Sequence, residues 1–261
     1  MYNKIKKTII FIIMALGISS CACSSKYQRQ NAADILPRKA FVHLEKSLIV
    51  KSCNGTQCIS MNFRSSASGF IVNLHSDGAF IITAAHFCKD SSPSIENTTV
   101  TSRYKAKRLD GTAFEAVSLH YQEDIDVCLV YAEGMTEDVS IVRIASRGPR
   151  PGEKIYNIGA PQSIVGPNMV PILEGRFNGE LEHNAFYTLP AAPGSSGSMI
   201  VNEQGELIGL LHSVFMRFHV LSLSTKYEDL KEYIDKYLCK YLLYKSVMQD
   251  LELSDIFTAK N

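Results

Sequence analysis

Short apolar runs separated by polar turns fill most of the chain between residues 41 and 223. The clearest pair covers residues 69–74 and 79–83, which are joined by His-Ser-Asp-Gly at residues 75–78. An Asp-Gly step between two apolar runs is typical of a β-hairpin. A second Asp-Gly step, at residues 110–111, separates two further runs in the same way. Many short strands at this spacing predict an antiparallel sandwich or barrel.

The run over residues 125–131 is almost entirely apolar, which predicts a strand buried on both of its faces. The same pattern of short runs predicts further strands over residues 47–52, 139–144, 154–158, 171–177, 185–189, 198–202, 207–214 and 218–223. No repeat of fixed period is present, so neither a solenoid nor a propeller is indicated.

A single helix is predicted near the end of the chain, over about residues 225–248, because apolar residues recur there every three or four positions. Thr225 and Glu228 have the spacing of a capping box at its start. We expect Cys239 to be a core residue of this helix. Residues 251–261 are expected to form a short tail.

Composition narrows the functional classes. The chain has 261 residues, of which 46% are hydrophobic, enough for one large domain or two small ones. A net charge of +1 argues against general nucleic-acid binding, which normally goes with a strongly basic surface. No residues recur at metal-ligand spacing and no cofactor motif is present, so we expect neither a metal nor a cofactor.

The first 20 residues differ from the rest, because three lysines precede an apolar stretch over residues 8–17. This layout is typical of a secretion signal. The apolar stretch is shorter than a membrane-spanning helix requires, so a signal is the first interpretation. Ile-Ser-Ser-Cys, ending at Cys21, resembles the lipobox of bacterial lipoproteins, which implies cleavage before Cys21 and its diacylation. Residues 21–40 would then form a polar tether. The alternatives are an ordinary signal cut near Ala22 or a retained anchor.

By this resemblance the protein is a lipoprotein of the cell envelope, held to a membrane by its N-terminal lipid. Ala22 follows the cysteine, in place of the aspartate associated with inner-membrane retention. We therefore expect the outer membrane, with the domain facing the periplasm.

Three polar motifs can supply one catalytic site. His86 follows Thr-Ala-Ala, Asp126 opens an apolar run, and Ser196 lies in a Gly-Ser-Ser-Gly turn. Serine attack on a carbonyl carbon needs a nucleophile, a base and a carboxylate that orients the base, and the order His, Asp, Ser is that of chymotrypsin. Asp124 and Ser195 are alternatives. Asp126 is favoured because it directly begins the apolar run, and Ser196 because a glycine follows it.

These motifs resemble the trypsin-like peptidases of the chymotrypsin fold, and their bacterial HtrA-type branch in particular. The resemblance extends over roughly residues 45–240. It is carried by residues 105–130, 151–153, 158–161, 192–198 and 205–209. The Gly-Ser-Ser-Gly-Ser turn is also similar to that of glutamyl endopeptidases.

The resemblance implies an all-β fold of two packed six-stranded antiparallel β-barrels with a C-terminal α-helix. The peptidase domain would cover residues 41–250, with barrel one at about residues 41–120 and barrel two at about residues 125–223. The implied activity is that of a serine endopeptidase, which cleaves peptide bonds of a protein or peptide substrate through an acyl-enzyme.

The same resemblance implies a role for each residue. Ser196 would be the nucleophile, His86 the general base and then acid, and Asp126 the group that fixes the imidazole tautomer. The backbone N–H groups of Gly194 and Ser196 would form the oxyanion hole. Glycine at position 194 would allow the backbone to turn without a Cβ clash.

Several positions depart from the family pattern. Ser195 replaces the aspartate that pairs with a newly cut N-terminus, so activation by N-terminal insertion is not expected. Pro190 replaces the acid of trypsins, which argues against a basic P1 residue. Leu211, His212 and Ser213 lie on the strand expected to wall the P1 pocket, and a small or apolar P1 residue is expected. Instead of lining the P1 pocket, the His212 side chain could approach the predicted catalytic aspartate or point into the core.

Export would make disulfides permissible. Cys53 and Cys58 flank an Asn-Gly turn, so their facing strands can place them for a bridge. Cys88 and Cys128 each follow a predicted catalytic residue by two positions and would be close if those residues are neighbours. For this second pair, a bridge and two buried free thiols are both open.

Two other functions remain as alternatives to the endopeptidase. One is a catalytically inactive lipoprotein that keeps the fold and holds a partner in its cleft. The other is an esterase, which would share the mechanism. An intact set of three catalytic residues argues against the inactive protein, because a binding module has no need of them.

Overall fold

The computed structural model describes residues 35–54, 57–90, 98–215, 218 and 220–258, with side chains described as far as residue 245. The predicted signal peptide, Cys21 and most of the tether lie outside the described residues. Among the helices that are described, none combines the length and the apolar character needed to cross a membrane.

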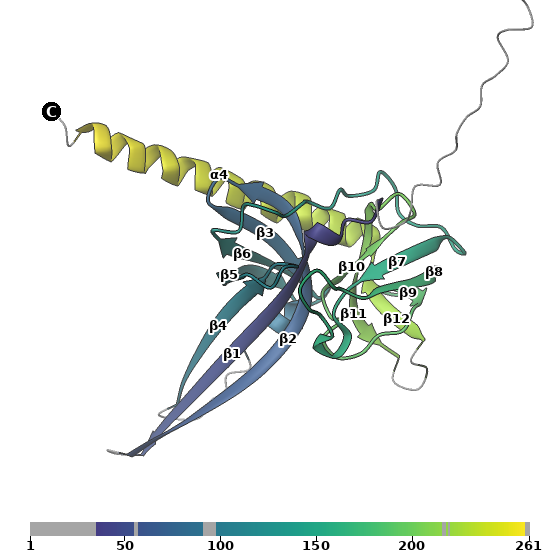
Figure 1. Ribbon diagram of the computed structural model, residues 1–261, viewed down its shortest axis with the longest axis horizontal. Helices are drawn as coiled ribbons and strands as arrows, with labels where there is room; N and C mark the ends of the chain where they lie inside the picture. Colours follow the sequence, from purple (N-terminus) through teal and green to yellow (C-terminus); the bar gives the residue numbers. More distant parts are fainter. Residues whose placement is uncertain (1–34, 55–56, 91–97, 216–217, 219, 259–261) are drawn as a thin grey trace, which may run out of the picture. The chain divides into compact units, whose positions relative to one another are not determined.

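In the described part of the chain, twelve strands close into two antiparallel β-barrels (Figure 1). Barrel one consists of β1 (Phe41–Asn54), β2 (Gln57–His75), β3 (Gly78–Thr83), β4 (Thr98–Lys107), β5 (Ala113–Gln122) and β6 (Val127–Glu133). Barrel two consists of β7 (Lys154–Ile158), β8 (Ile172–Leu181), β9 (Asn184–Thr188), β10 (Ser198–Val201), β11 (Leu207–Val214) and β12 (Leu221–Thr225). The helical elements are η1 (Arg38–Ala40), α3 (Ala85–Cys88), η2 (Pro161–Ser163) and α4 (Tyr227–Thr258).

The two barrels share one topology. The neighbour order is β1-β2-β3-β6-β5-β4 in the first and β7-β8-β9-β12-β11-β10 in the second. The chain therefore builds the same six-stranded arrangement twice without repeating its sequence. Together with the C-terminal helix, this is the predicted chymotrypsin-like fold, and the fold prediction is confirmed.

The predicted boundary between the barrels was wrong. Strand β6 belongs to barrel one, because it pairs with β3 and β5, so barrel two begins only at β7. The strand predicted over residues 139–144 does not form. Only Ile144 makes an isolated bridge, to Leu207, within the segment that leads from one barrel to the other. Of this run only Val142 is buried, whereas Ile141 is exposed, so the segment is an irregular connection rather than a strand.

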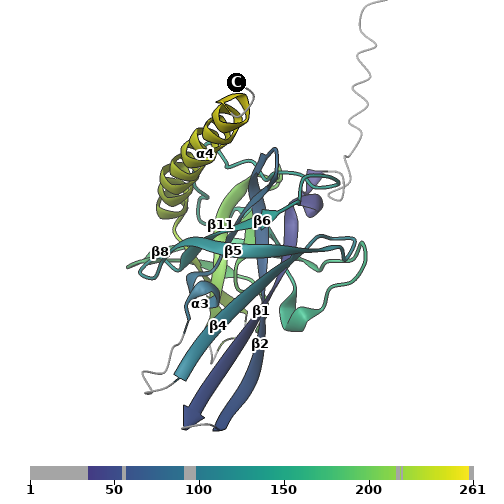
Figure 2. The same ribbon diagram turned by 90° about the vertical axis from the view of Figure 1, so that its left-hand side faces the viewer.

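Strands β1 and β2 are much longer than predicted and extend outward together with β4 (Figures 1 and 2). Their pairing runs without interruption from Phe41↔Phe70 to Asn54↔Gln57. The predicted disulfide between Cys53 and Cys58 is confirmed in this extension. Residues 57–65 of β2 are exposed on both faces, so burial gave no clue to this part of the strand.

Each barrel has its own apolar interior, and a third apolar layer lies between the barrels and reaches α4. Strand β6 contributes to two of these layers. Cys128 and Val130 lie in the interior cluster of barrel one, whereas Val127 and Leu129 pack with residues of barrel two. The prediction that this strand is buried on both faces is confirmed.

Helix α4 begins at Tyr227 and continues to Thr258, so it includes most of the predicted tail. The predicted capping box does not form, because Thr225 ends β12 and its hydroxyl donates to the Ile125 carbonyl at 2.7 Å. Cys239 is exposed rather than in the core. It lies nine residues, or about two and a half turns, after the buried Leu230 and so faces the opposite side of the helix.

Candidate active site

His86 stands on the short helix α3, directly after the buried strand β3. A helix of four residues leaves its terminal carbonyl groups without helical partners. Here the buried ammonium of Lys46 is the hydrogen-bond donor, to the carbonyl of Phe87 at 3.1 Å and to that of Lys89 at 2.8 Å. The element that carries His86 is therefore held by barrel one rather than by its own hydrogen bonds.

Asp126 is held in a turn immediately before β6. Its N–H donates to the Glu123 carbonyl at 3.2 Å, and its φ of 52° lies in the left-handed region that a non-glycine residue seldom adopts. This conformation turns its carboxylate toward His86. Asp126 Oδ2 lies 2.8 Å from His86 Nδ1, and Oδ1 accepts the His86 main-chain N–H at 2.9 Å.

The carboxylate of Asp126 is poised to stay ionised. Burial acts to raise the pKa of Asp126, but the hydrogen bond from the His86 ring, the charge of that ring and its main-chain N–H outweigh burial. The pKa of Asp126 is therefore below its ordinary value. An ionised carboxylate on Nδ1 keeps the proton on that nitrogen and leaves Nε2 free as a base.

Cys88 and Cys128 form a disulfide, which decides between the two alternatives left open by the sequence. The bond joins α3, two residues after His86, to β6, two residues after Asp126. It therefore links the two segments that present the imidazole and the carboxylate.

The serine loop begins with a turn over residues 192–195. Ser195 N–H donates to the Ala192 carbonyl at 2.9 Å, and Gly194 has a φ of 93°, as expected for a type II turn with proline second and glycine third. The Pro193 carbonyl accepts the Gln162 N–H at 2.6 Å. Because the peptide is planar and trans, this bond directs the Gly194 N–H to the opposite side. Within the described residues, neither Gly194 N–H nor Ser196 N–H has an acceptor.

Ser68 of β2 anchors this loop and was missed in the sequence. Its N–H donates to the Ser196 carbonyl at 2.9 Å, and its hydroxyl donates to the Gly194 carbonyl at 2.9 Å. The same hydroxyl accepts the Ala160 N–H at 2.9 Å. The Ser-Gly-Phe step that opens the first hairpin was the available signal, but a serine inside a strand gives no indication of long-range contacts.

The two candidate serines differ in exposure and in the hydrogen bonds of their hydroxyl groups. Ser195 is 1% exposed and its Oγ accepts the Ala192 N–H at 3.4 Å, which closes the turn. Ser196 is partly exposed, and its hydroxyl donates to the His212 carbonyl at 3.2 Å. In this structure the Ser196 hydroxyl forms no hydrogen bond with His86. Ser196 is therefore the more accessible of the two serines, with its hydroxyl turned to a main-chain acceptor.

The four residues predicted to line the P1 pocket lie in three different environments. Leu211 does not line a substrate surface, because it is 1% exposed and packs in the interior of barrel two. Pro190 and Ser213 are exposed. The His212 side chain is directed at Asp126, with Nδ1 3.9 Å from Oδ2, which is one of the two alternatives stated for it.

A cavity of about 380 Å³ opens beside this group. Charged and polar side chains of both signs line it together with the two imidazoles and the carboxylate: Lys89, Glu123, Asp124, His183 and Asn184. Asp124, the alternative to Asp126, is exposed and accepts a hydrogen bond from Gln122 at 3.3 Å. It forms no bond with His86.

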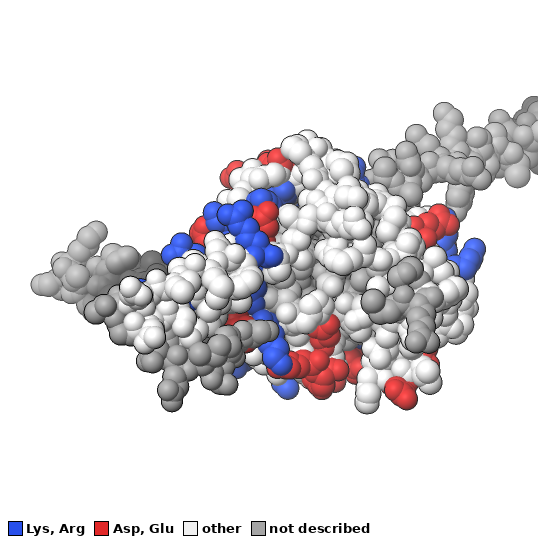
Figure 3. Space-filling model, turned by 90° about the horizontal axis from the view of Figure 1, so that it is seen from below, with Lys and Arg blue, Asp and Glu red and all other residues white. Residues whose placement is uncertain are grey.

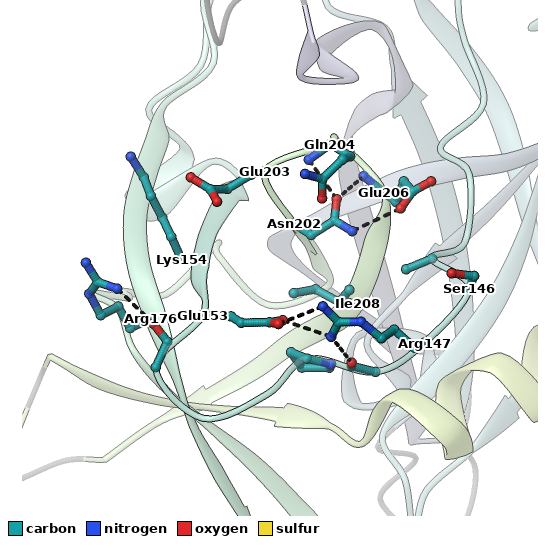
Figure 4. A pocket seen from close by; sticks show the side chains of 14 residues that line it. Ser146, Arg147, Glu153, Lys154, Arg176, Asn202, Glu203, Gln204, Glu206 and Ile208 are labelled. Carbon is teal, nitrogen blue, oxygen red and sulfur yellow. Dashed lines mark hydrogen bonds and ion pairs between the residues drawn. The ribbon is translucent and has the colours of Figure 1, made fainter.

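A second cavity, of about 570 Å³, lies on barrel two (Figure 4). Several of its charged groups have partners: Arg147 pairs with Glu153 at 2.7 Å, and Arg176 donates to the Gly152 carbonyl at 2.8 Å. None of the three candidate catalytic side chains lines it. The face in Figure 3 likewise carries basic and acidic side chains next to one another.

Two barrels of one topology, with a hydrogen-bonded His–Asp pair from the first and a glycine-bounded serine loop from the second, define the class of trypsin-like peptidases. The sequence profile of the trypsin-like peptidase domain matches residues 67–210, more than half of the chain. The chain belongs to this family. Residues 86, 126 and 196 all lie in the matched range, whereas His212 lies just beyond it.

Two relatives named serine protease HTRA1, from Xenopus tropicalis and Xenopus laevis, are each 29% identical to this chain over 153 residues. The aligned stretch covers 56% of this chain and 30% of each relative. The chain therefore spans less than a third of the length of the curated relatives it matches. The similarity supports the trypsin-like class and the HtrA-type resemblance.

Proposed function

We propose that the protein is a serine endopeptidase that uses Ser196, His86 and Asp126 as a catalytic triad. The observation that carries the proposal is the double hydrogen bond between Asp126 and His86, which sets the imidazole tautomer that a general base needs. Membership of the trypsin-like family and the printed name of the relatives support it.

The reaction follows from the roles of these groups. The Ser196 hydroxyl turns from the His212 carbonyl to His86, gives its proton to Nε2 and attacks the substrate carbonyl carbon. The N–H groups of Gly194 and Ser196 stabilise the oxyanion. Collapse of this intermediate breaks the C–N bond, and His86 returns the proton to the departing amine. Water, activated by the same imidazole, then hydrolyses the ester on Ser196.

Fluorophosphonate labelling of the purified protein tests the proposal. We expect labelling of Ser196 and its loss in Ser196→Ala, while Ser195→Ala keeps labelling. A folded protein that does not label would support the inactive binding protein instead. Labelling together with cleavage of ester but not peptide substrates would support the esterase.

For substrate preference, we propose a small or apolar P1 residue rather than a basic one. Trypsins hold a basic P1 residue with an acid at the position that is Pro190 here. The acidic residues Glu123 and Asp124 instead line the cavity that contains His86 and Asp126. A cleavage profile on a peptide library is the test. Dominant cleavage after Arg or Lys would contradict this preference.

We further propose that Cys21 carries a lipid that anchors the protein in the cell envelope, facing the periplasm from the outer membrane. The support is the lipobox pattern of residues 18–21. Mass spectrometry of the N-terminal peptide should find a diacylated cysteine, and Cys21→Ala should release the protein from the membrane fraction. An unmodified N-terminus near residue 22 would indicate an ordinary signal peptide.

A further inference from the structure

His212 contacts both ends of the proposed triad. Its Nδ1 lies 3.9 Å from Asp126 Oδ2, and its carbonyl accepts the Ser196 hydroxyl at 3.2 Å. Asp126 in turn holds His86, at 2.8 Å from the same Oδ2. One carboxylate is therefore shared by two imidazoles, and the residue that supplies the second imidazole also holds the nucleophile.

A β-bulge in β11 explains this arrangement. Leu211 is paired with Ser224 and Ser213 with Leu223, so His212 is an extra residue without a partner across the ladder. Bulges redirect a side chain and leave backbone groups unpaired. Here Leu211 enters the interior of barrel two, while His212 turns its ring to Asp126 and its free carbonyl to Ser196.

The surroundings of the His212 ring keep it neutral at neutral pH. Its side chain is 11% exposed, and Nδ1 lies 2.9 Å from the Ser213 hydroxyl. Burial lowers the pKa of His212, the Asp126 carboxylate offsets part of this effect, and the His86 ring lowers it further. The other ionisable groups around the adjoining cavity are Lys89, Glu123, Asp124 and His183.

We propose that His212 is a positioning residue of the triad: its neutral ring holds the Asp126 carboxylate against His86, and its protonation draws that carboxylate away. The proposal rests on the proposed peptidase function. When neutral, the ring lies beside Asp126 Oδ2, the oxygen that His86 Nδ1 also approaches. When charged, it becomes a second cation beside one carboxylate and competes with His86 for it.

Steady-state kinetics on a peptide substrate test this role. We expect His212→Ala to lower kcat by about tenfold to a hundredfold with little change in KM, because a misplaced carboxylate misorients the base. His212→Asn should recover most of kcat, since an amide nitrogen can take the place of Nδ1. His120→Asn is the matched control, because His120 also has a burial-lowered pKa but packs against α4.

The pH profile separates positioning from a structural role. In the wild type, two imidazoles must be neutral, so log(kcat/KM) should fall with a slope approaching two at acid pH. In His212→Asn the slope should be one, and in His120→Asn it should stay as in the wild type. A slope of one in the wild type, or an unchanged kcat in His212→Ala, would refute the proposal.

A measurement that does not depend on turnover tests the contact between His212 and Asp126 separately from the proposed peptidase activity. In Ser196→Ala, NMR titration of the ring nitrogens should show that a further Asp126→Asn change lowers the pKa of His212, because the carboxylate raises it. An unchanged His212 titration would rule out the contact. If the ring titrates as expected but the wild type neither labels nor cleaves, the proposed function fails and the contact stands.

Discussion

Asp126 holds His86 at two points, the ring through Oδ2 and the main chain through Oδ1. The second bond fixes the position of the helix α3 that carries the ring, and the first fixes the rotation of the ring itself. One carboxylate therefore sets both the place and the tautomer of the proposed base. Because both hydrogen bonds depend on Asp126, substitutions there test how far activity depends on the position of His86.

Asp126→Asn should abolish most activity with little loss of folding. An amide can keep one of the two bonds but cannot stabilise the imidazolium, and the corresponding change in a serine-protease triad lowers kcat by about 10⁴. Peptide hydrolysis and circular dichroism measure the two effects. Asp124→Asn, a neighbour without a bond to His86, is the control. Equal losses in the two variants would show that Asp124 had been wrongly set aside.

Gly197→Ala should inactivate the protein and destabilise it more than the same substitution at an open turn glycine. Gly197 has a φ of 83°, and a Cβ there would lie 2.2 Å from the Ser68 carbonyl oxygen. Gly152 is the matched control, with a φ of 88° and no atom within 4 Å of an added Cβ. Gly152→Ala should cost only the backbone strain, about 1–2 kcal/mol of unfolding free energy. Chemical denaturation and fluorophosphonate labelling compare the two.

The two disulfides should differ in their effect on activity. Removing the Cys88–Cys128 bond, which closes 40 residues of sequence, should cost about 4 kcal/mol in the chain-entropy view and lower turnover. Removing the Cys53–Cys58 bond, with a separation of 5, should cost about 2 kcal/mol and leave turnover intact. Double Cys→Ser variants, measured by denaturation and kinetics, provide the comparison. Loss of turnover on removing Cys53–Cys58 would contradict this assignment.

Acidification should loosen the contact between α4 and barrel one at Asp77. Burial acts to raise the pKa of Asp77, but hydrogen bonds from Lys245, Tyr131 and His75 outweigh it and hold that pKa well below the ordinary value of 3.8. A lowered folded pKa gives stability that is complete above about pH 4 and is lost as the pH falls further.

Asp77→Asn is the test of this pH dependence. The variant should be less stable than the wild type at pH 7, by less than about 1 kcal/mol because the carboxylate is half exposed. The difference in unfolding free energy should shrink below pH 4. A difference that stays constant with pH would mean that packing, not charge, is lost.

Much of the fold could be predicted because its signals are local. The Asp-Gly step before β3 and the buried run of β6 act over a few residues, and both predictions hold. The exposed part of β2 was missed although Ile59, Met61 and Phe63 alternate with polar residues as in a strand, and the structure leaves all three exposed. The end of α4 was also missed, because the apolar periodicity was followed only to about residue 248.

The site was predictable only in part. His86 and Asp126 come together as the motif order suggested, and their bond could be expected from residue type alone. The direction of His212 could not, because a single bulge in β11 reverses the alternation on which the prediction depended. Ser68 and the left-handed Gln162, which brace the serine loop from other elements, have no local signal either.

The division of the site between two barrels has a consequence for biosynthesis. His86 and Asp126 come from the first barrel, whereas Ser196 and the bulged strand come from the second, which closes only with β12 near residue 225. A growing polypeptide on the ribosome thus acquires its proposed nucleophile last. The proposed triad is therefore incomplete until β12 has been synthesised and barrel two can close.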